Sequence, residues 1–418
     1  MSKNNKGNVF AIAIMFFLFA MISFVTGLQN PMGIIAKAQF GATNLMSQLG
    51  NAANFIAYAF MGLPAGFLLK GKGYKFTALA AVTIGFVGVG ISYLSGVFSS
   101  FVIYLLGAFV SGFSMCMLNT VVNPMLNTLG GGGNRGNQLI QLGGSCNSLA
   151  ATIVPVLAGY LIGEVTEKTQ VADVNPALFI AMAIFALAFA IIFFSNIPEP
   201  ELEAAKSAGE VKKEGTLDSI KGALSHKNLV FGVIAIFLYV GIEVGIPNVA
   251  NLYMTSADGL GLAAGVAGAL VGAYWFLMLC GRLIGGAIGG KVSSRAMMIS
   301  VSSAAIVFIL LGMFLPSEWT INVLEANVPV AIFFFVLCGL CTSVMWGAVF
   351  NLAVEGLGIY TSIASGLFMV MVCGGGILPL VQGAVADKAG YINSYWVLIA
   401  ALAYILWFAL IGSRTNEE

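Results

Sequence analysis

A single carboxylate interrupts a long apolar stretch of the chain. Glu243 lies near the middle of residues 231–254, a run long enough to cross a bilayer, which takes about 20 residues. An ionisable group at that depth costs at least about 2.5 kcal/mol to insert, so it normally faces a bundle interior or a water-filled cavity. Burial also favours the neutral carboxyl group, so Glu243 can exchange a proton there. Pro247, one turn later, lacks a backbone donor, and we expect it to loosen the helix locally.

Amide side chains are the other informative polar groups inside the apolar runs. Asn and Gln donate and accept hydrogen bonds, which suits a ligand whose hydroxyl groups do both. An aromatic face covers the C–H side of a sugar ring. The alternative is that individual amides only join helices to each other. The candidate binding residues are Gln29, Asn30, Asn119, Asn123, Gln141, Asn147, Asn248, Trp346 and Asn351.

These amides predict a neutral ligand, since a strongly charged solute would need Lys or Arg beside it. We expect no such cation in the cavity. Arg282 stands within two turns of the cytoplasmic end of its run, where a long side chain can extend to the membrane surface. Glu243 together with amide oxygens is also a plausible ligand set for a hard cation, so the coupling ion is either H⁺ or Na⁺.

The composition is that of a polytopic membrane protein. Of the 418 residues, 59% are hydrophobic and 8% are charged, whereas soluble domains have about 25% charged residues. A net charge of +1 argues against a nucleic-acid role, which would require a basic face. The runs contain no metal-ligand spacing, nucleophile motif or carboxylate pair, so we expect neither an enzyme nor a cofactor. The glycine-rich GGGGNRGN at 130–137 lacks the GK[ST] ending of a phosphate-binding loop and predicts a flexible connection.

Twelve apolar runs predict twelve transmembrane helices. An even number puts both termini on one side of the membrane. With the N-terminus inside, all but three of the 18 Lys and Arg residues lie inside, the exceptions being Lys37, Lys168 and Lys388, which agrees with the positive-inside rule. Both termini are therefore predicted to be cytoplasmic. The runs cover residues 9–29, 46–69, 76–97, 100–126, 138–163, 176–196, 228–254, 263–288, 296–315, 329–352, 361–385 and 391–412.

One long polar segment divides the chain into two sets of six runs. We predict an N-terminal six-helix bundle at 1–197, a cytoplasmic linker at 198–227 and a C-terminal six-helix bundle at 228–418. Within the linker, residues 217–224 are predicted to form a short helix on the membrane surface.

The two halves resemble each other in sequence. AYAFMGLPAG at 57–66 resembles AYWFLMLCGR at 273–282, and IVPVLAG at 153–159 resembles ILPLVQG at 377–383. A third pair places Asn119 opposite Trp346. Three pairs in the same order indicate a duplicated six-helix unit. Parallel repeats of this kind have their substrate site between the halves, near the membrane midplane.

Four segments carry a resemblance to a known family: YVGIEV at 239–244, NPMLNTLG at 123–130, GRLIG at 281–285 and GLFMVMVCGGGILPLVQGAVAD at 366–387. With them the chain resembles the major facilitator superfamily, in particular its fucose and glucose–galactose permease branch. The resemblance covers nearly the whole chain and implies an all-α membrane fold of two pseudo-symmetric six-helix bundles. The basic turn KGKGYK at 70–75 resembles the loop between the second and third helices, without the usual Asp-Arg.

The chain departs from the fucose permease pattern at three positions. Asn30 and Asn119 stand where that permease has an aspartate and a glutamate, and both are neutral here. In the fifth helix, Asn147 keeps its place in the Gln-x-x-Asn pattern of the branch, whereas Gly144 replaces the Gln. The resemblance therefore transfers the binding role of Asn147 directly, and Asn30 and Asn119 only as positions. With no acidic proton carrier at these positions in the first half, coupling is predicted at Glu243.

We predict a secondary transporter that imports a neutral monosaccharide, a hexose or deoxyhexose, by alternating access, with H⁺ or Na⁺ coupled through Glu243. Its partners would be the sugar, the ion and the lipid bilayer, and we expect a monomer in the cell inner membrane. One alternative is a carrier of another small polar solute, or an exporter of amphipathic compounds with Phe and Met lining its pocket. Another is a sensor or membrane-bound enzyme, for which the short loops offer no output domain.

Overall fold

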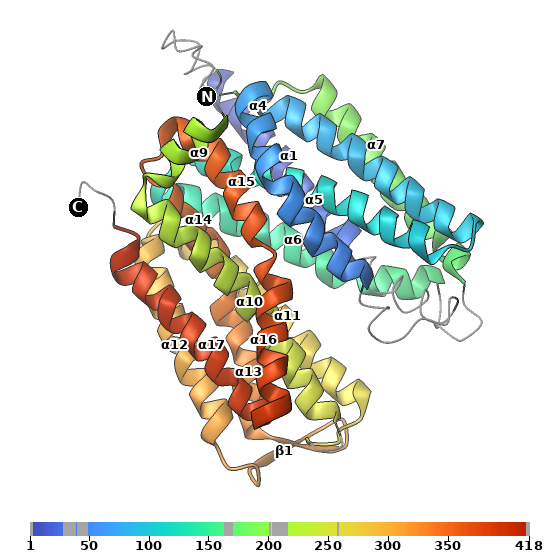
Figure 1. Cartoon of the computed structure of the whole chain (residues 1–418), viewed down its shortest axis with the longest axis vertical. Helices are drawn as coiled ribbons and strands as arrows, with labels where there is room; N and C mark the ends of the chain where they lie inside the picture. Colours follow the sequence, from blue (N-terminus) through green and yellow to red (C-terminus); the bar gives the residue numbers. More distant parts are fainter. Residues whose placement is uncertain are drawn as a thin grey trace. The chain divides into compact units, whose positions relative to one another are not determined.

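The computed structural model describes residues 3–27, 39, 49–162, 170–199, 202, 216–256 and 259–414, and these are mostly α-helical (Figure 1). The elements up to the linker are α1 (Lys3–Gly27), α4 (Leu49–Val97), α5 (Phe101–Leu129), α6 (Gly133–Ile162), the 3₁₀ turn η1 (Val171–Val174), α7 (Asn175–Phe194) and α9 (Thr216–Leu224). The helix predicted at 217–224 is therefore present as α9.

The second half of the chain contains helices and one β-hairpin. These elements are α10 (Lys227–Thr255), α11 (Ala264–Ile288), α12 (Ser294–Phe314), β1 (Thr320–Val323), β2 (Ala326–Pro329), α13 (Val330–Thr342), α14 (Met345–Val354), the 3₁₀ turn η2 (Gly358–Tyr360), α15 (Thr361–Met371), α16 (Gly374–Ala389), α17 (Tyr391–Trp407) and the π-helical turn η3 (Phe408–Gly412). The strands pair antiparallel, with Thr320 opposite Pro329 and Val323 opposite Ala326.

The helices account for the twelve predicted runs. Ten segments of the described chain are long and apolar enough to cross a membrane. One of them, Ala53–Val97 in α4, covers most of the second predicted run and all of the third, and the fifth run lies in α6, outside the ten. The tenth and eleventh runs each contain two helices in succession, α13 with α14 and α15 with α16.

A sharp turn at Gly73 separates the two membrane segments of α4. Gly73 has φ 83°, a conformation that side chains with a Cβ rarely adopt. The carboxylate of Glu199 closes the turn, accepting hydrogen bonds from the backbone N–H groups of Tyr74 at 2.7 Å and Lys75 at 2.8 Å. Lys75 Nζ donates to the carbonyl of Ser195 at 2.7 Å. Glu199 thus provides a carboxylate at this turn, where KGKGYK has none of its own.

The Gly374–Gly376 sequence lies beside a helix break and a close helix contact. Helix α15 ends at Met371 and α16 begins at Gly374. A Cβ on Gly374 would overlap the backbone carbonyl of Phe237 in α10. These glycines therefore stand where one helix gives way to the next, and they allow α16 to pack closely on α10.

The chain forms two compact units that exchange a segment. Unit 1 comprises residues 1–129, 146–223 and 357–370, and unit 2 comprises residues 130–145, 224–356 and 371–418. Each unit therefore contains a short stretch from the other half of the sequence. The first residues of these stretches, Gly130 and Leu357, have the same sequence offset as Asn119 and Trp346. The exchange follows the internal repeat.

Glycines hold the exchanged stretch 357–370 against α4 within unit 1. A Cβ on Gly66 would lie 3.1 Å from the Cα atom of Gly366, and one on Gly62 would lie 2.7 Å from the Gly366 carbonyl oxygen. Ser365 Oγ donates to the carbonyl of Thr120 in α5 at 3.0 Å. Small residues allow membrane helices to approach closely, so this contact depends on glycine at all three positions.

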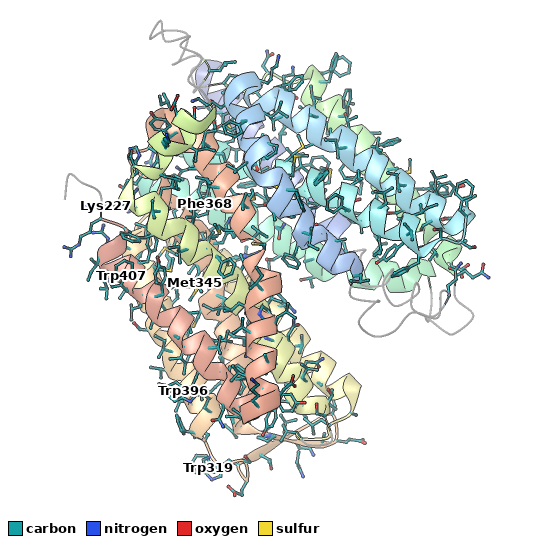
Figure 2. The ribbon with its side chains drawn as sticks, viewed as in Figure 1. Lys227, Trp319, Met345, Phe368, Trp396 and Trp407 are labelled. Carbon is teal, nitrogen blue, oxygen red and sulfur yellow. The ribbon has the colours of Figure 1, made fainter. Side chains whose placement is uncertain are left out.

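Tryptophans lie toward both ends of unit 2. Figure 2 shows Trp407 toward the C-terminal end of α17 and Trp319 beside the hairpin at the opposite end of the unit. Trp319 is 58% exposed and Trp396, on α17, is 48% exposed. Tryptophan is enriched where a membrane meets water, so these positions agree with a bilayer around the helices of this unit.

Candidate functional site

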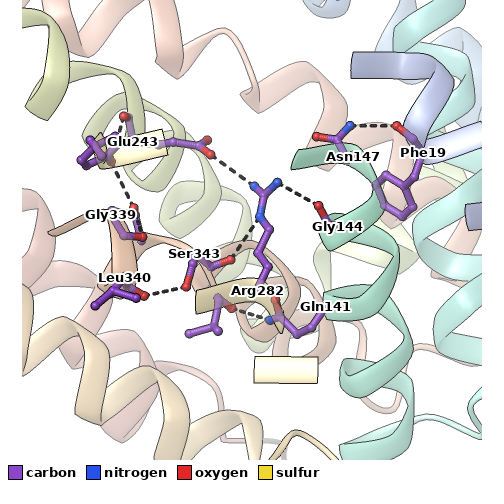
Figure 3. Close-up of polar contacts among 12 residues, drawn as sticks. Phe19, Gln141, Gly144, Asn147, Glu243, Arg282, Gly339, Leu340 and Ser343 are labelled. Carbon is purple, nitrogen blue, oxygen red and sulfur yellow. Dashed lines mark hydrogen bonds and ion pairs between the residues drawn. The ribbon is translucent and has the colours of Figure 1, made fainter. Parts of the chain in front are cut away.

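Glu243 forms an ion pair with Arg282 within unit 2. Glu243 lies in α10, and Arg282 lies less than two turns before the end of α11. Arg282 Nη2 is 3.4 Å from Glu243 Oε1 (Figure 3). The Arg282 and Glu243 side chains are 13% and 16% exposed. Each charge reduces the free-energy cost of burying the other, and the remaining exposure allows water to reach the pair.

Arg282 does not extend to the membrane surface, so that prediction was wrong. Its Nη1 donates to the carbonyl of Gly144 in α6 at 3.2 Å, and its Nε donates to the carbonyl of Ser343 at 3.4 Å. Ser343 stands at the break between α13 and α14, where helix carbonyl groups lose their usual partners. A carboxylate and two carbonyl groups within reach outweigh hydration at the surface, because hydrogen bonds from a charged donor are strong.

Pro247 does not break α10, which runs continuously from Lys227 to Thr255, and the predicted loosening is not seen. Proline has no N–H group to donate to the Glu243 carbonyl four residues earlier. The Tyr274 hydroxyl donates to that carbonyl instead, at 3.1 Å, and lies 3.0 Å from Thr342 Oγ1. Tyr274 therefore replaces the missing donor and ties α10 to α11 and α13 beside the ion pair.

Two aromatic residues lie next to the pair. Tyr239 precedes Glu243 by one helical turn, so both lie on one face of α10. Its hydroxyl lies beside Glu243 and Arg282, and its ring centroid is 6.2 Å from that of Trp346. Trp346, predicted to contact a sugar ring, is thus close to the ion pair through Tyr239.

Gln141, also predicted to bind the ligand, contacts the protein in unit 2. Its Nε2 donates to the carbonyl of Val344 at 2.7 Å and lies 3.3 Å from Asn137 Oδ1, and the residue is 2% exposed. A Cβ on Gly347 would lie 2.7 Å from the same nitrogen. This amide joins helices, which is the alternative that the sequence left open.

The candidate amides of unit 1 have protein partners as well. Asn119 Nδ2 donates to the Tyr58 hydroxyl at 3.0 Å, and Asn123 Nδ2 donates to the Asn119 carbonyl at 2.8 Å. Asn147 Nδ2 donates to the carbonyl of Phe19 in α1 at 3.0 Å (Figure 3). Asn119 and Asn147 are only partly buried.

The remaining candidates are dispersed. Asn351 Nδ2 donates to Ser294 Oγ, the hydroxyl of the first residue of α12, at 2.9 Å and is 5% exposed. Asn248 lies exposed on α10. Gln29 and Asn30 fall outside the described residues. The binding roles of all nine residues stay predictions.

Sequence reasoning missed Arg282, Tyr239, Tyr274 and Tyr58. Tyr239 was detectable, because an i, i+4 spacing places it on the Glu243 face. Pro247 implies that some donor must reach the Glu243 carbonyl, but the sequence does not identify Tyr274 as that donor. The position of Arg282 near the end of an apolar run was misleading, because it predicted a side chain at the membrane surface.

The ion pair gives unit 2 one carboxylate that can gain a proton beside a permanent cation. Arginine stays charged in proteins, so only Glu243 changes the charge of the pair. Among the residues that the structure describes, no group of three His, Cys, Asp or Glu side chains is arranged to hold a metal ion. With Glu243 ionised the pair carries no net charge, and with Glu243 protonated it would carry one positive charge.

Comparisons with known proteins identify the family of the chain. A profile described as Major Facilitator Superfamily matches residues 12–379. The chain is 29% identical over 419 residues to a glucose/galactose transporter of Brucella abortus, covering 99% of this chain and 96% of that one. It is 23% identical to the L-fucose-proton symporter of Escherichia coli, covering 96% and 92%.

Solved structures match the fold over the whole length. A crystal structure of the transporter FucP in the outward conformation has a TM-score of 0.82 at 20% identity and covers 98% of this chain and 100% of that one. This likeness confirms the predicted fold class.

Proposed function

Because the chain belongs to the major facilitator superfamily, we propose that it imports a neutral monosaccharide, a hexose or deoxyhexose, together with a proton that Glu243 carries. The superfamily assignment and the multi-pass helical fold make it a membrane transporter and not an enzyme. The sugar class, the coupling ion, the inner-membrane location and the cytoplasmic termini are parts of the proposal.

The observation that carries the proposal is the Glu243–Arg282 pair. Arg282 contributes a fixed positive charge at 3.4 Å from the carboxylate. A sodium ion would have to displace that cation or bind beside it, whereas a proton only neutralises one oxygen. The pair thus favours H⁺ over Na⁺, and the similarity to a proton symporter supports the same choice.

A neutral sugar is the substrate that fits the polar residues best. With Glu243 charged, the pair has no net charge, so it does not select an anion or a cation. Asn119 and Asn147 present amides in unit 1, and Trp346 presents an aromatic face in unit 2. The similarity to a glucose/galactose transporter supports a hexose.

Uptake into proteoliposomes tests the proposal. We expect accumulation of a labelled hexose under an inward proton gradient and none under a sodium gradient. Glu243→Gln should lower accumulation to the level of passive equilibration while retaining counterflow, because the neutral amide mimics the protonated acid but cannot release a proton. The control is Glu355→Gln, a change at an exposed carboxylate that should leave accumulation unchanged.

Accumulation by Glu243→Gln at the wild-type level would place coupling at another residue. Sodium-driven uptake would replace the proton with Na⁺. Transport of amphipathic compounds without preference among hexoses would favour the exporter instead.

A further inference from the structure

The hairpin between α12 and α13 has two different faces. Residues that pair directly across two strands have their side chains on the same face. One face is apolar and consists of Ile321 with Val328 and Val323 with Ala326. The opposite face consists of Thr320 with Pro329 and Asn322 with Asn327, and it has all the polar side chains of the two strands. This alternation is typical of a strand pair that covers an apolar surface.

The described part of the chain covers the apolar face only under β2. Val328 is 0% exposed, whereas its partner Ile321 is 49% exposed. Strand β2 leads directly into α13, whose first residue, Val330, donates its N–H to the carbonyl of Trp319 at 2.7 Å. Strand β1 therefore lies beyond the edge of the helices, with its apolar side chains turned toward whatever surrounds the unit.

The turn at the tip of the hairpin has an unusual sequence for its conformation. Leu324 and Glu325 have φ of 48° and 64°, so both central residues of this two-residue turn are left-handed. Such turns normally contain Asn-Gly, Asp-Gly or Gly-Gly, because a side chain with a Cβ is strained there. Leu324 is also 66% exposed. In water the tip would combine a strained backbone with an exposed leucine, in a hairpin that is at best marginally stable by itself.

The position of the hairpin in the chain shows which surface lies beside it. It connects two segments that can cross a membrane, Ser294–Phe314 and Val330–Val354, and β2 ends immediately before the second. The end of a bilayer span is therefore the residue next to β2. Residues 315–329 contain Glu318 and Glu325 but no Lys or Arg. This loop thus has no cation of its own to attract an anionic lipid headgroup.

We propose that β1 and the tip of the hairpin lie in the headgroup region of a zwitterionic bilayer surface, with Ile321, Val323 and Leu324 toward the acyl chains and the polar face toward water. Lipid then covers the apolar area that the helices leave open, and this burial offsets the strain of the turn. Trp319 at the start of β1 has the amphipathic ring that is enriched at this depth (Figure 2). The hairpin fixes the depth of the adjoining ends of α12 and α13 in the membrane.

Fluorophores on the two faces of β1 test the proposal. A nitrobenzoxadiazole group is attached to Ile321→Cys or, as the matched control, to Thr320→Cys, after the six native cysteines have been replaced. Both positions are exposed, so neither substitution should disturb the fold. In phosphatidylcholine nanodiscs with a single protein copy, we expect blue-shifted emission at position 321 that lipid with a shallow spin label quenches. Position 320 should give water-like emission without quenching.

Two results of this comparison would overturn the proposal. One is equal quenching, or none, at the two positions. The other is a blue shift at position 321 that spin-labelled lipid does not quench, because protein would then cover this face instead of the bilayer.

The charge of the lipid tests the choice of headgroup. Partial replacement of phosphatidylcholine by phosphatidylglycerol should weaken quenching at position 321, because two glutamates would then face anionic headgroups. Glu318→Gln/Glu325→Gln should remove this dependence. Quenching that stays the same or grows with phosphatidylglycerol while the glutamates are present would overturn the assignment to a zwitterionic surface.

Variants of the turn separate hairpin formation from membrane contact. Leu324→Asn/Glu325→Gly supplies the residues that this turn prefers, so the strands should stay paired without the apolar tip. We expect weaker quenching at position 321 in this variant. Glu325→Gly alone keeps Leu324 and should quench like the parent. Parent-like quenching in the double variant, or an equal fall in both variants, would overturn the insertion of Leu324.

Discussion

The polar interiors of the two units differ in kind. Four of the described helices of unit 1, namely α1, α4, α5 and α7, contain no Asp or Glu, and their interior contacts include the neutral bond from Asn119 to Tyr58. Unit 2 has the Glu243–Arg282 pair, with Tyr274 fixing the helix backbone beside it. A duplicated sequence has thus kept its helices in both halves, while the Glu243–Arg282 pair lies in one.

That difference suggests a division of labour. Hydrogen bonds between membrane helices average about 0.6 kcal/mol, so neutral contacts can re-form at little cost when a ligand binds. A buried charge that loses its partner costs about 3–5 kcal/mol, enough to drive a conformational change. We expect unit 1 to contribute mainly recognition and unit 2 to contribute the response to the ion.

The largest effect should come from removing the cation of unit 2. Arg282→Met leaves Glu243 buried without a counter-ion, and we expect a loss of about 3 kcal/mol in stability. The double variant Arg282→Met/Glu243→Gln should recover most of it, since neither charge then remains. Thermal unfolding in detergent of both single variants and the double variant measures this. A double variant no more stable than Arg282→Met would show that the unpaired Glu243 is not the cause of the stability loss.

A smaller effect is expected at Gly144, where the branch has Gln. Gly144→Gln brings a long side chain into the space of the Arg282 guanidinium, and overpacking of this kind costs about 1–3 kcal/mol. Gly144→Ala is the matched control, because its Cβ would lie 3.4 Å from Arg282 Cδ, an ordinary contact. Thermal stability should fall in the first variant only. Equal stability of the two variants would mean that the absence of a side chain at Gly144 is not what makes room for Arg282.

The smallest effects compare one tyrosine in each unit. Tyr274→Phe removes the donor to the carbonyl that Pro247 frees and the contact with Thr342, and we expect a loss of about 1 kcal/mol. Tyr58→Phe removes only the acceptor of Asn119, which we expect to cost about 0.6 kcal/mol. Unfolding of both variants under the same conditions ranks them. A larger loss in Tyr58→Phe would reverse the contrast drawn between the units.

The sequence predicted the membrane helices well, because such a helix can be recognised from the length and the apolar composition of a run alone. Residues 329–352 read as one run, however, and the break after Thr342 was missed, since no proline or glycine stands at Ser343 or Val344. The segment exchange was also out of reach. It depends on which faces meet across hundreds of residues, and apolar periodicity does not record that.

The site residues also differ in whether the sequence could identify them. Glu243 was identifiable because a carboxylate in an apolar run is costly anywhere in a membrane. Its partner was not, because 39 residues separate Arg282 from Glu243 and only the rotation of two helices brings them together. Amides such as Gln141 gave no sign of whether they would bind protein or ligand, since both uses need the same donor and acceptor.

The exchanged stretch 357–370 has a consequence for how the protein is made. Residues 1–129 leave the ribosome long before Gly366, which covers Gly62 and Gly66 of α4. Until translation passes Val370, that glycine face of the first half has no partner from its own unit. We therefore expect the contact between Gly366 and α4 to form only after translation has passed Val370, and a chain truncated at the linker to lack it.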